Sequence, residues 1–315
     1  MSDVRQIPLF PDLPTSAEDL NRHTELRHTV SIFQQYLIRE GKSEHTIKAF
    51  TSDLQLLGEQ SGETTAVGQY TTTMLNAFLD WLEYGRGVPC SRKSYARRVT
   101  TLKVYFKWLH TLGAILHDPA KAVLQRSGPA PLATVLAPDE VQAAIFAARQ
   151  MKRGEEPDTR PEMLFRLILD TGIKKSETVA LVPQHIDRSD PKKPLLVVRH
   201  KVRNVYKERK IELSPEWVRL LDEYLMQYRP QETIFNCTAR NLEYILTDIG
   251  EAAGIPHKLS FEMLRWTCAV RDTRAGQTED YIREKLGLSP ISWVETHEKL
   301  KKLVEQQLQD ESAGV

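Results

Sequence analysis

Helical periodicity is the feature of this sequence that most limits the fold it can adopt. From about residue 27 to Gly113, apolar residues recur every three or four positions, as on the buried stripe of an amphipathic helix. The spacing predicts four helices, and their apolar positions are Val30, Phe33 and Leu37, then Ile47, Phe50, Leu54 and Leu57, then Met74, Phe78 and Leu82, and finally Tyr95, Leu102, Phe106 and Leu109. Ser43 is a candidate N-cap for the second of them. β-branched alternation is missing here, so this region is predicted to be all-helical.

A stretch rich in proline, glycine and small residues separates this region from the rest of the chain. Residues 126–134 read RSGPAPLAT, which is the composition of a linker. A length of 315 residues is enough for about two domains. We therefore expect a flexible arm over residues 1–24, a helical domain over 25–126, a linker over 127–136 and a second domain over 137–315.

The second domain is predicted to combine helices with a small β-hairpin. It opens with Pro138, Asp139 and Glu140, a helix start in which the acids lie near the positive end of the helix dipole. The clearest strand signals are residues 195–199 (LLVVR) and 210–213 (KIEL), and everything beyond Pro215 reads as helical. The whole chain is therefore predicted to be mostly α, with a small β-hairpin or sheet.

Composition excludes several classes of protein. Hydrophobic residues make up 41% and charged residues 27%, which is typical of a globular chain. No apolar run approaches the roughly 20 residues of a membrane helix, and the N-terminus lacks the features of a signal peptide. Cys90, Cys237 and Cys268 have no metal-binding spacing, so we expect a reduced, cytoplasmic protein without metal or cofactor. The formal net charge is +1, so only the distribution of charge can point to nucleic acid.

One predicted helix carries its positive charge on one face. Residues 91–110 contain six lysines and arginines and no acid. Within an arc of about 140° lie the residues that we call the cationic ridge, namely Arg92, Lys93, Arg97, Lys103 and Lys107. Arg98 falls instead on the apolar face, and Trp108 lies at the edge of the ridge. A solvated lysine-rich face is the simpler interpretation, but such faces usually contain acids, and their absence favours a polyanionic partner.

A second basic cluster lies between the two predicted strands. Residues 199–210 hold six lysines and arginines and one glutamate, and we call them the basic hairpin. A basic hairpin can lie along DNA phosphates, which would use Lys201, Arg203, Lys207 and Arg209. Lysines that protect an edge strand from pairing are an equally good explanation. Two basic surfaces, one in each domain, would suit two lobes that close around a duplex.

Ordered motifs give the chain a family resemblance over roughly residues 27–310. Residues 43–54 (SEHTIKAFTSDL) and the helix at 91–110 are similar to a DNA-facing core-binding domain. Residues 170–177 (DTGIKKSE), followed by Ala180, Leu181 and Asp187, resemble a first catalytic box. Residues 264–269 (LRWTCA), Gly276 and 286–292 (LGLSPIS) resemble a second. The chain thus resembles the tyrosine recombinases, the phage integrase and Xer-type family, which implies a SAM-like core-binding domain followed by an α+β catalytic-type domain.

The resemblance implies phosphodiester transfer through a tyrosine. In that family a tyrosine hydroxyl attacks a DNA phosphate, two arginines and a histidine or tryptophan stabilise the developing charge, and a hairpin lysine protonates the leaving hydroxyl. Guanidinium groups suit the first task because their forked donors match phosphate oxygens.

This sequence departs from the family pattern at most catalytic positions. Lys174 stands for the first arginine, Glu262 and Leu288 stand for histidines, and His297 stands for the nucleophilic tyrosine. Lys201, Arg265 and Glu177 match the hairpin lysine, the second arginine and the acid of the first box. We therefore expect a DNA-binding protein that has lost strand cleavage. The alternative is an active recombinase that uses an unusual nucleophile or a partner's catalytic groups.

Individual candidates keep a simpler structural explanation beside the functional one. Arg265 is expected either to contact DNA phosphate or to pair internally with Glu262. Cys268 is expected to be a small buried side chain rather than a nucleophile. Tyr206, in the basic hairpin, is expected to lie on the surface.

Double-stranded DNA is the expected partner, and a membrane is not. An active recombinase is a second candidate partner, and a regulatory role for a mobile element is a further hypothesis. The C-terminal segment 294–308 carries four apolar residues on one face, which would pack either on a second copy of the chain or on their own domain; they are Leu300, Leu303, Val304 and Leu308.

Overall fold

The four helices predicted in the first part of the chain all form, and the computed structural model describes residues 13–124, 131–153, 156–202 and 205–313. The chain divides into two compact units, Met1–Ala130 and Pro131–Val315. That boundary falls inside the segment expected to be a linker, 127–136.

The first unit is helical throughout its described residues. Its elements are η1 (Ala17–Asp19), α1 (Leu26–Arg39), α2 (Glu44–Ser61), η2 (Val67–Gln69), α3 (Thr72–Asp80), the π-helical turn η3 (Trp81–Gly85) and α4 (Arg92–Thr111). Ser43 caps α2 as predicted, because its side chain accepts a hydrogen bond from the Thr46 N–H at 3.2 Å. Ser91 caps α4 in the same way through the Ser94 N–H. The predicted apolar stripes meet in one core, in which Phe33, Leu54, Phe78 and Phe106 are fully buried.

Part of the expected N-terminal arm is packed on this unit. Residues 1–12 lie outside the described residues, but Leu20 and Thr24 are buried. The Thr24 carbonyl accepts a hydrogen bond from the Val67 N–H at 2.9 Å, and the Arg22 carbonyl accepts one from the Gly68 N–H at 3.0 Å. The expectation of a flexible arm over all of residues 1–24 therefore differs from the structure for residues 20–24.

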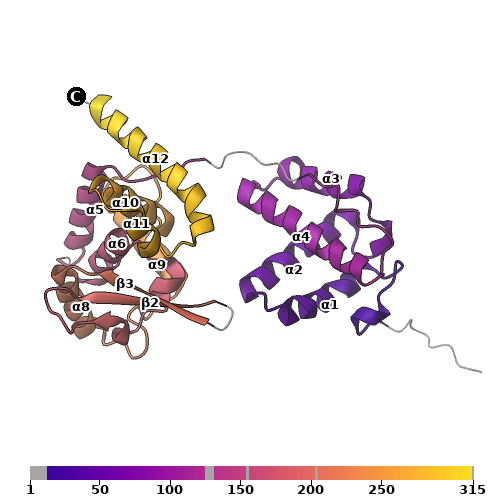
Figure 1. The fold of residues 1–315 in the computed structure, drawn as a ribbon, viewed down its shortest axis with the longest axis horizontal. Coiled ribbons are helices and arrows are strands. Elements are labelled where there is room, and N and C mark those ends of the chain that lie inside the picture. The colour runs from indigo at the N-terminus through magenta and orange to yellow at the C-terminus, as the bar shows by residue number, and fades with distance from the viewer. Residues whose placement is uncertain (1–12, 125–130, 154–155, 203–204, 314–315) are drawn as a thin grey trace, which may run out of the picture. The chain divides into compact units, whose positions relative to one another are not determined.

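The second unit packs helices around a small antiparallel sheet. Its elements are α5 (Pro138–Gln150), α6 (Arg160–Thr171), α7 (Lys175–Val179), η4 (Pro183–His185), β1 (Ile186–Asp187), β2 (Leu195–Val202), β3 (Val205–Glu212), α8 (Pro215–Tyr228), α9 (Ala239–Ala252), α10 (Phe261–Arg274), α11 (Glu279–Lys285) and α12 (Pro290–Ala313). The strand order is β1-β2-β3, and β2 pairs with β3 from Leu195–Glu212 to Val202–Val205. The two long strands extend beyond the helices of this unit (Figure 1). The predicted hairpin is confirmed. Strand β1 was not predicted, because two residues are too few to show a strand pattern.

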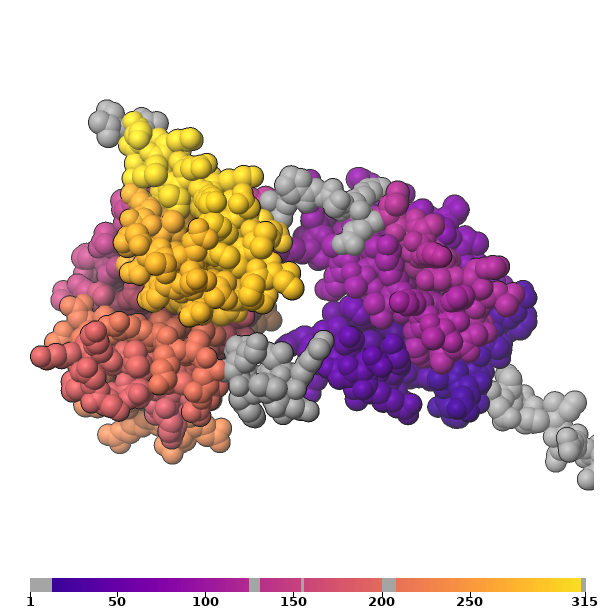
Figure 2. All heavy atoms as spheres, in the orientation of Figure 1, coloured from indigo at the N-terminus to yellow at the C-terminus, as the bar shows by residue number. Residues whose placement is uncertain are grey.

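The C-terminal helix α12 packs on its own unit. Leu300 and Leu303 are each 2% exposed, and Val304 packs against the same cluster beside α10 and α11. Leu308 is 47% exposed, and α12 lies on the face of the unit that Figure 2 shows. Its last turns contact the unit through Gln307, which donates to the Leu136 carbonyl at 3.0 Å, and through Glu311, which pairs with Arg274 at 2.7 Å. For Leu300 and Leu303 the structure shows packing on their own domain, against the apolar surface of α10 and α11, while packing on a second copy stays a prediction.

A buried ion pair fixes the start of α7 against the sheet. The Arg209 guanidinium on β3 donates to both carboxylate oxygens of Glu177, at 2.9 and 2.7 Å, and its Nε donates to the Lys285 carbonyl at 3.0 Å. The two side chains are 10% and 9% exposed. Burial raises the pKa of the Glu177 carboxyl, but the hydrogen bonds and charge of Arg209 outweigh it, so the pKa lies below its ordinary value of 4.5.

We predict that Glu177→Gln lowers the free energy of unfolding at pH 7 by about 3 kcal/mol, because it leaves a buried arginine without its counter-charge. A lowered folded pKa means that the contribution of Glu177 is present above pH 4.5 and is lost as pH falls through the folded value. The difference between wild type and variant should therefore shrink below about pH 4.5. Urea unfolding across this range measures it.

Glu243→Gln is the matched control. Glu243 pairs with Lys175 at 2.6 Å, but both side chains are more than 40% exposed. Its loss should change the free energy of unfolding by less than about 1 kcal/mol. Equal effects for the two variants would contradict the structural importance of the buried pair.

Candidate functional site

The cationic ridge lies on the solvent side of α4. Arg92, Lys93, Arg97 and Lys107 are exposed and Lys103 is half-buried. The opposite face of α4 is buried, through residues such as Tyr95, Leu102 and Phe106. The helix thus presents its cations to solvent from a rigidly packed element.

A buried carboxylate lies beneath the ridge. Asp53 on α2 is 1% exposed and accepts hydrogen bonds from Arg97 Nε at 3.1 Å, Arg97 NH2 at 2.7 Å and Thr101 Oγ1 at 2.8 Å. Arg98 Nε lies 3.5 Å from the same carboxylate, and Arg98 NH1 donates to Cys90 Sγ at 2.7 Å. The absence of acids within α4 therefore does not leave Arg97 and Arg98 without a counter-charge.

The sequence contained a signal for this carboxylate. Asp53 lies three residues after Phe50 and four before Leu57, on the stripe that the helix buries. A carboxylate on a buried stripe needs a cationic or hydrogen-bonding partner. The partners lie 44 and 48 residues further along the chain, so the pattern within one helix could not name them.

The basic hairpin forms on β2 and β3. Lys201 lies opposite Tyr206, and Lys207 lies opposite His200. Arg203 and the side chains of residues 200–207 lie outside the described residues. Arg199 pairs with Glu208 across the strands at 2.5 Å.

Arg209 faces the interior rather than solvent. It lies opposite Val198, which is 2% exposed, and two residues before Ile211, which is also 2% exposed. Because side chains alternate between the two faces of a strand, Arg209 shares the buried face. Its guanidinium is bonded to Glu177, so it presents no fork to a DNA phosphate.

The family's catalytic positions surround a pocket of about 350 Å³ in the second unit, which we call the recombinase-type pocket. Lys174 and Lys175 come from the start of α7, Glu262 and Arg265 from α10, and Leu288 from the turn before α12. The remaining lining residues are Phe261, Trp266, Leu286 and Thr296. The structure thus brings together Lys174, Glu262, Arg265 and Leu288, as the motif order predicted.

Arg265 is bonded to the backbone of its own unit. Its NH1 donates to the Gly172 carbonyl, and its NH2 donates to the Leu286 carbonyl at 3.3 Å. Burial lowers the pKa of its guanidinium, and the charge of Glu177 opposes that shift. Gly172 has a φ of +60°, and a Cβ there would lie 2.8 Å from Leu286. The turn after α6 and the turn after α11 are therefore held in close contact, with Arg265 bonded to both.

Lys174 gives the pocket its second cationic group. Its backbone N–H donates to Glu177 at 2.7 Å. Burial lowers the pKa of its amine, Glu177 opposes that shift, and Arg265 and Arg209 add to it. An ammonium here is a point charge, without the planar fork of an arginine.

His297 does not line this pocket. Its ring stacks on Trp293 at a centroid distance of 5.3 Å, and its Nε2 lies 3.2 Å from Glu279 Oε1. Thr296, the preceding residue on α12, lines the pocket instead, and its hydroxyl donates to the Ser292 carbonyl at 2.8 Å. Sequence reasoning missed Thr296 because the motif aligns its neighbour with the nucleophile.

Cys268 lies behind the pocket in a buried polar cluster. It is 1% exposed, and burial raises the pKa of its thiol to about 12. Asp272, on the same helix, pairs with the buried Lys285 at 2.7 Å. A neutral buried thiol is a poor nucleophile.

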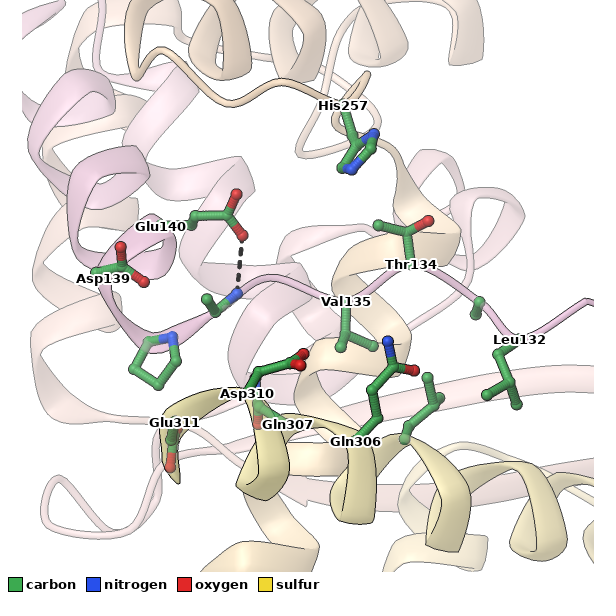
Figure 3. A pocket seen from close by; sticks show the side chains of 14 residues that line it. Leu132, Thr134, Val135, Asp139, Glu140, His257, Gln306, Gln307, Asp310 and Glu311 are labelled. Atoms are coloured by element: carbon green, nitrogen blue, oxygen red, sulfur yellow. Dashed lines mark hydrogen bonds between the residues drawn. The ribbon is translucent and has the colours of Figure 1, made fainter. Parts of the chain in front are cut away.

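A second cavity of this unit is acidic and is unsuited to phosphate. This cavity of about 910 Å³ lies between residues 132–140 and the C-terminal half of α12 (Figure 3). Asp139, Glu140, Asp310 and Glu311 line it, without a lysine or arginine, so it would repel phosphate. In the described part of the chain, no cluster of three or more histidine, cysteine or acidic side chains could hold a metal ion. No described helix is long and apolar enough to span a bilayer.

Comparison with known proteins places both units in one structural class. The sequence profile of the phage integrase N-terminal SAM-like domain matches residues 30–112. A crystal structure of the XerH site-specific recombinase bound to a palindromic difH substrate covers 91% of this chain and 93% of its own, with a TM-score of 0.69 and 17% identity. A lambda integrase dimer bound to a COC' core site covers 86% and 94%, with a TM-score of 0.68 and 16% identity. These likenesses show the fold.

Sequence relatives agree with that class. Tyrosine recombinase XerC of Mycobacterium sp. (strain KMS) is 27% identical over 166 residues, which span 52% of this chain and about half, 55%, of that relative. Tyrosine recombinase XerD of Listeria monocytogenes is 23% identical over 286 residues, covering 86% and 93%. Together with the fold and the ordered motifs, these matches show that the chain is similar to the tyrosine recombinases, and that its residues 30–112 match the phage integrase SAM-like domain.

Proposed function

We propose that this protein binds double-stranded DNA and does not cleave it. The observation that carries the proposal is the content of the recombinase-type pocket, where Lys174, Glu262 and Leu288 replace an arginine and two histidines and where no tyrosine is among the lining residues. The retained fold supports DNA recognition, while the chemistry of the pocket argues against phosphodiester transfer.

Strand cleavage would need an activated nucleophile and stabilised phosphorane charge. Among the described lining residues Thr296 carries the one hydroxyl, and that hydroxyl donates to the Ser292 carbonyl. Arg265 donates to two other carbonyls. Glu262 adds a carboxylate, and a like charge about 4 Å from a phosphate costs about 1 kcal/mol in water and about 4 kcal/mol at an effective dielectric of 20.

DNA binding would use cations of both basic surfaces. The proposed contacts are the cationic ridge (Arg92, Lys93, Arg97, Lys103 and Lys107) together with Lys201, Arg203 and Lys207 of the basic hairpin. Arg209 and Arg265 are left out because their guanidinium groups are bonded within the unit and are not exposed. Arg97 is also bonded, to Asp53, but its side chain is 41% exposed. Contacts of this kind go to phosphate and position the protein without reading sequence.

Reversing two charges of the ridge tests DNA binding. We expect Lys93→Glu with Lys107→Glu to weaken duplex binding at least tenfold for all sequences and to reduce the slope of log affinity against log salt by about 2. Arg97 is not chosen, because a glutamate there would face the buried Asp53. Fluorescence anisotropy with labelled duplexes between 50 and 200 mM salt gives both quantities.

Lys42→Glu with Lys121→Glu is the control, since both lysines are exposed on the same unit but lie outside the ridge. The control should bind as wild type does. Equal losses in the two double variants would mean that overall charge, rather than the ridge, drives binding.

Nicked suicide duplexes test the absence of cleavage. Wild type should give no covalent protein–DNA adduct on a denaturing gel, and neither should His297→Tyr, because Lys174, Glu262 and Leu288 remain. Each missing stabiliser in such a site is worth about 10² to 10³ in rate. The informative variant restores all four groups with Lys174→Arg, Glu262→His, Leu288→His and His297→Tyr.

An adduct formed by wild type would overturn the proposal in favour of an active recombinase with an unusual nucleophile. Loss of that adduct in Thr296→Ala would then identify Thr296 as the nucleophile, since it is the residue of α12 that lines the pocket. An adduct that appears only with an active recombinase present would point to catalytic groups supplied by a partner.

A further inference from the structure

A second basic pocket lies at the other end of α6 from the recombinase-type pocket. It has a volume of about 400 Å³ and opens where the end of α5, the first half of α6 and α8 meet. Five cationic and three acidic side chains line it, which leaves a formal charge of +2. Its lining residues on α6 are Glu162 and Arg166, whereas the recombinase-type pocket begins at Lys174, beyond the end of the helix.

One buried carboxylate organises this pocket. Glu162 is 2% exposed. Its Oε1 accepts hydrogen bonds from Arg149 Nε at 3.2 Å and Arg166 Nε at 3.1 Å, and its Oε2 lies 3.7 Å from Lys152 Nζ. Lys152 also pairs with Glu223, and Arg166 NH1 lies 3.9 Å from Glu216, so these three cations are balanced by three carboxylates. The formal charge of +2 therefore comes from the two other cations of the pocket, Arg153 and Arg219.

The two arginines that bind Glu162 do so through Nε. Arg149 uses Nε for its carboxylate, and its two terminal nitrogens have no hydrogen-bond partner among the described residues. Arg166 NH1 lies 3.9 Å from Glu216, a carboxylate that is 68% exposed. A guanidinium held through Nε keeps its outer pair of donors available, which is the fork that matches phosphate oxygens.

Two further arginines extend the same surface. Arg153 follows the end of α5, and Arg219 lies on α8. Both are exposed, and neither side chain has an ion pair or hydrogen bond within the part of the chain that the structure describes. Forks from three different helices therefore converge on one opening.

We propose that this pocket is a binding site for a phosphate-bearing anion. A tetrahedral anion with several oxygens can accept from forks on different helices at once, which a single planar carboxylate does less well. Leu220 is the one apolar side chain among the lining residues, and none is aromatic, so the pocket suits the phosphate groups of a ligand rather than a base. The site does not depend on DNA binding by the cationic ridge or on the state of the recombinase-type pocket.

Isothermal titration of the full chain with inorganic pyrophosphate at low salt tests the site. We expect Arg153→Glu with Arg219→Glu to weaken pyrophosphate binding at least tenfold. Both residues are exposed, so the variant should keep the circular dichroism spectrum and melting temperature of wild type. Lys192→Glu with Lys193→Glu removes the same charge from an exposed turn elsewhere on the unit and should bind as wild type does.

The fork geometry has its own readout. Arg153→Lys with Arg219→Lys keeps the charge but removes the paired donors, and we expect a loss of threefold or more. No heat of binding in wild type, or equal binding by the two charge-reversed variants, would overturn the proposal.

A short duplex identifies the source of the phosphate. If Arg153→Glu with Arg219→Glu also weakens duplex binding, the anion is a nucleic-acid backbone. If only pyrophosphate binding is lost, the ligand is a free phosphate compound. If the protein does not bind DNA through the cationic ridge, the duplex experiment gives no binding to compare. Pyrophosphate binding does not depend on the ridge, so it decides whether the pocket binds phosphate.

Discussion

The second unit depends on the buried ion pair between Glu177 and Arg209. One guanidinium joins the start of α7, strand β3 and the end of α11, through two bonds to Glu177 and one to the Lys285 carbonyl. Both charges are almost excluded from water, so neither partner can be lost without leaving the other uncompensated. This pair holds α7, β3 and α11 together, whether or not the recombinase-type pocket performs chemistry.

The polar groups beside this ion pair are bonded within the fold. Arg265 keeps its position on α10, yet its donors go to the Gly172 and Leu286 carbonyls and fasten two turns together. The aligned nucleophile position carries His297, which stacks on Trp293 outside the pocket. The first unit uses a similar principle, because buried Asp53 holds Arg97 while the rest of the ridge faces solvent. In both units, a buried carboxylate fixes an arginine.

Local patterns in the sequence were sufficient for the helices, the hairpin and the grouping of Lys174, Glu262, Arg265 and Leu288. Ser43 predicted a helix start because an N-cap is a local interaction. The contacts between distant residues at the pocket were predicted from the order of the family motifs. Arg209 was predicted to contact DNA because every cation of the hairpin was counted together. The alternation of strand side chains between the two faces of the sheet was not taken into account. The partners of Asp53 lie more than 40 residues away, and packing decides such pairs. The two residues of β1 are too few to give a periodicity.

The central claim is that the polar cluster at the recombinase-type pocket now serves the fold rather than phosphate chemistry. Replacing Arg265 with methionine keeps the apolar stem and removes the donors to both carbonyls. Parallel measurement of urea unfolding and duplex affinity for Arg265→Met tests the claim most directly. The account predicts that the free energy of unfolding falls by about 2 kcal/mol or more, with duplex affinity changed less than twofold. Unchanged stability with a tenfold loss of duplex affinity would contradict it.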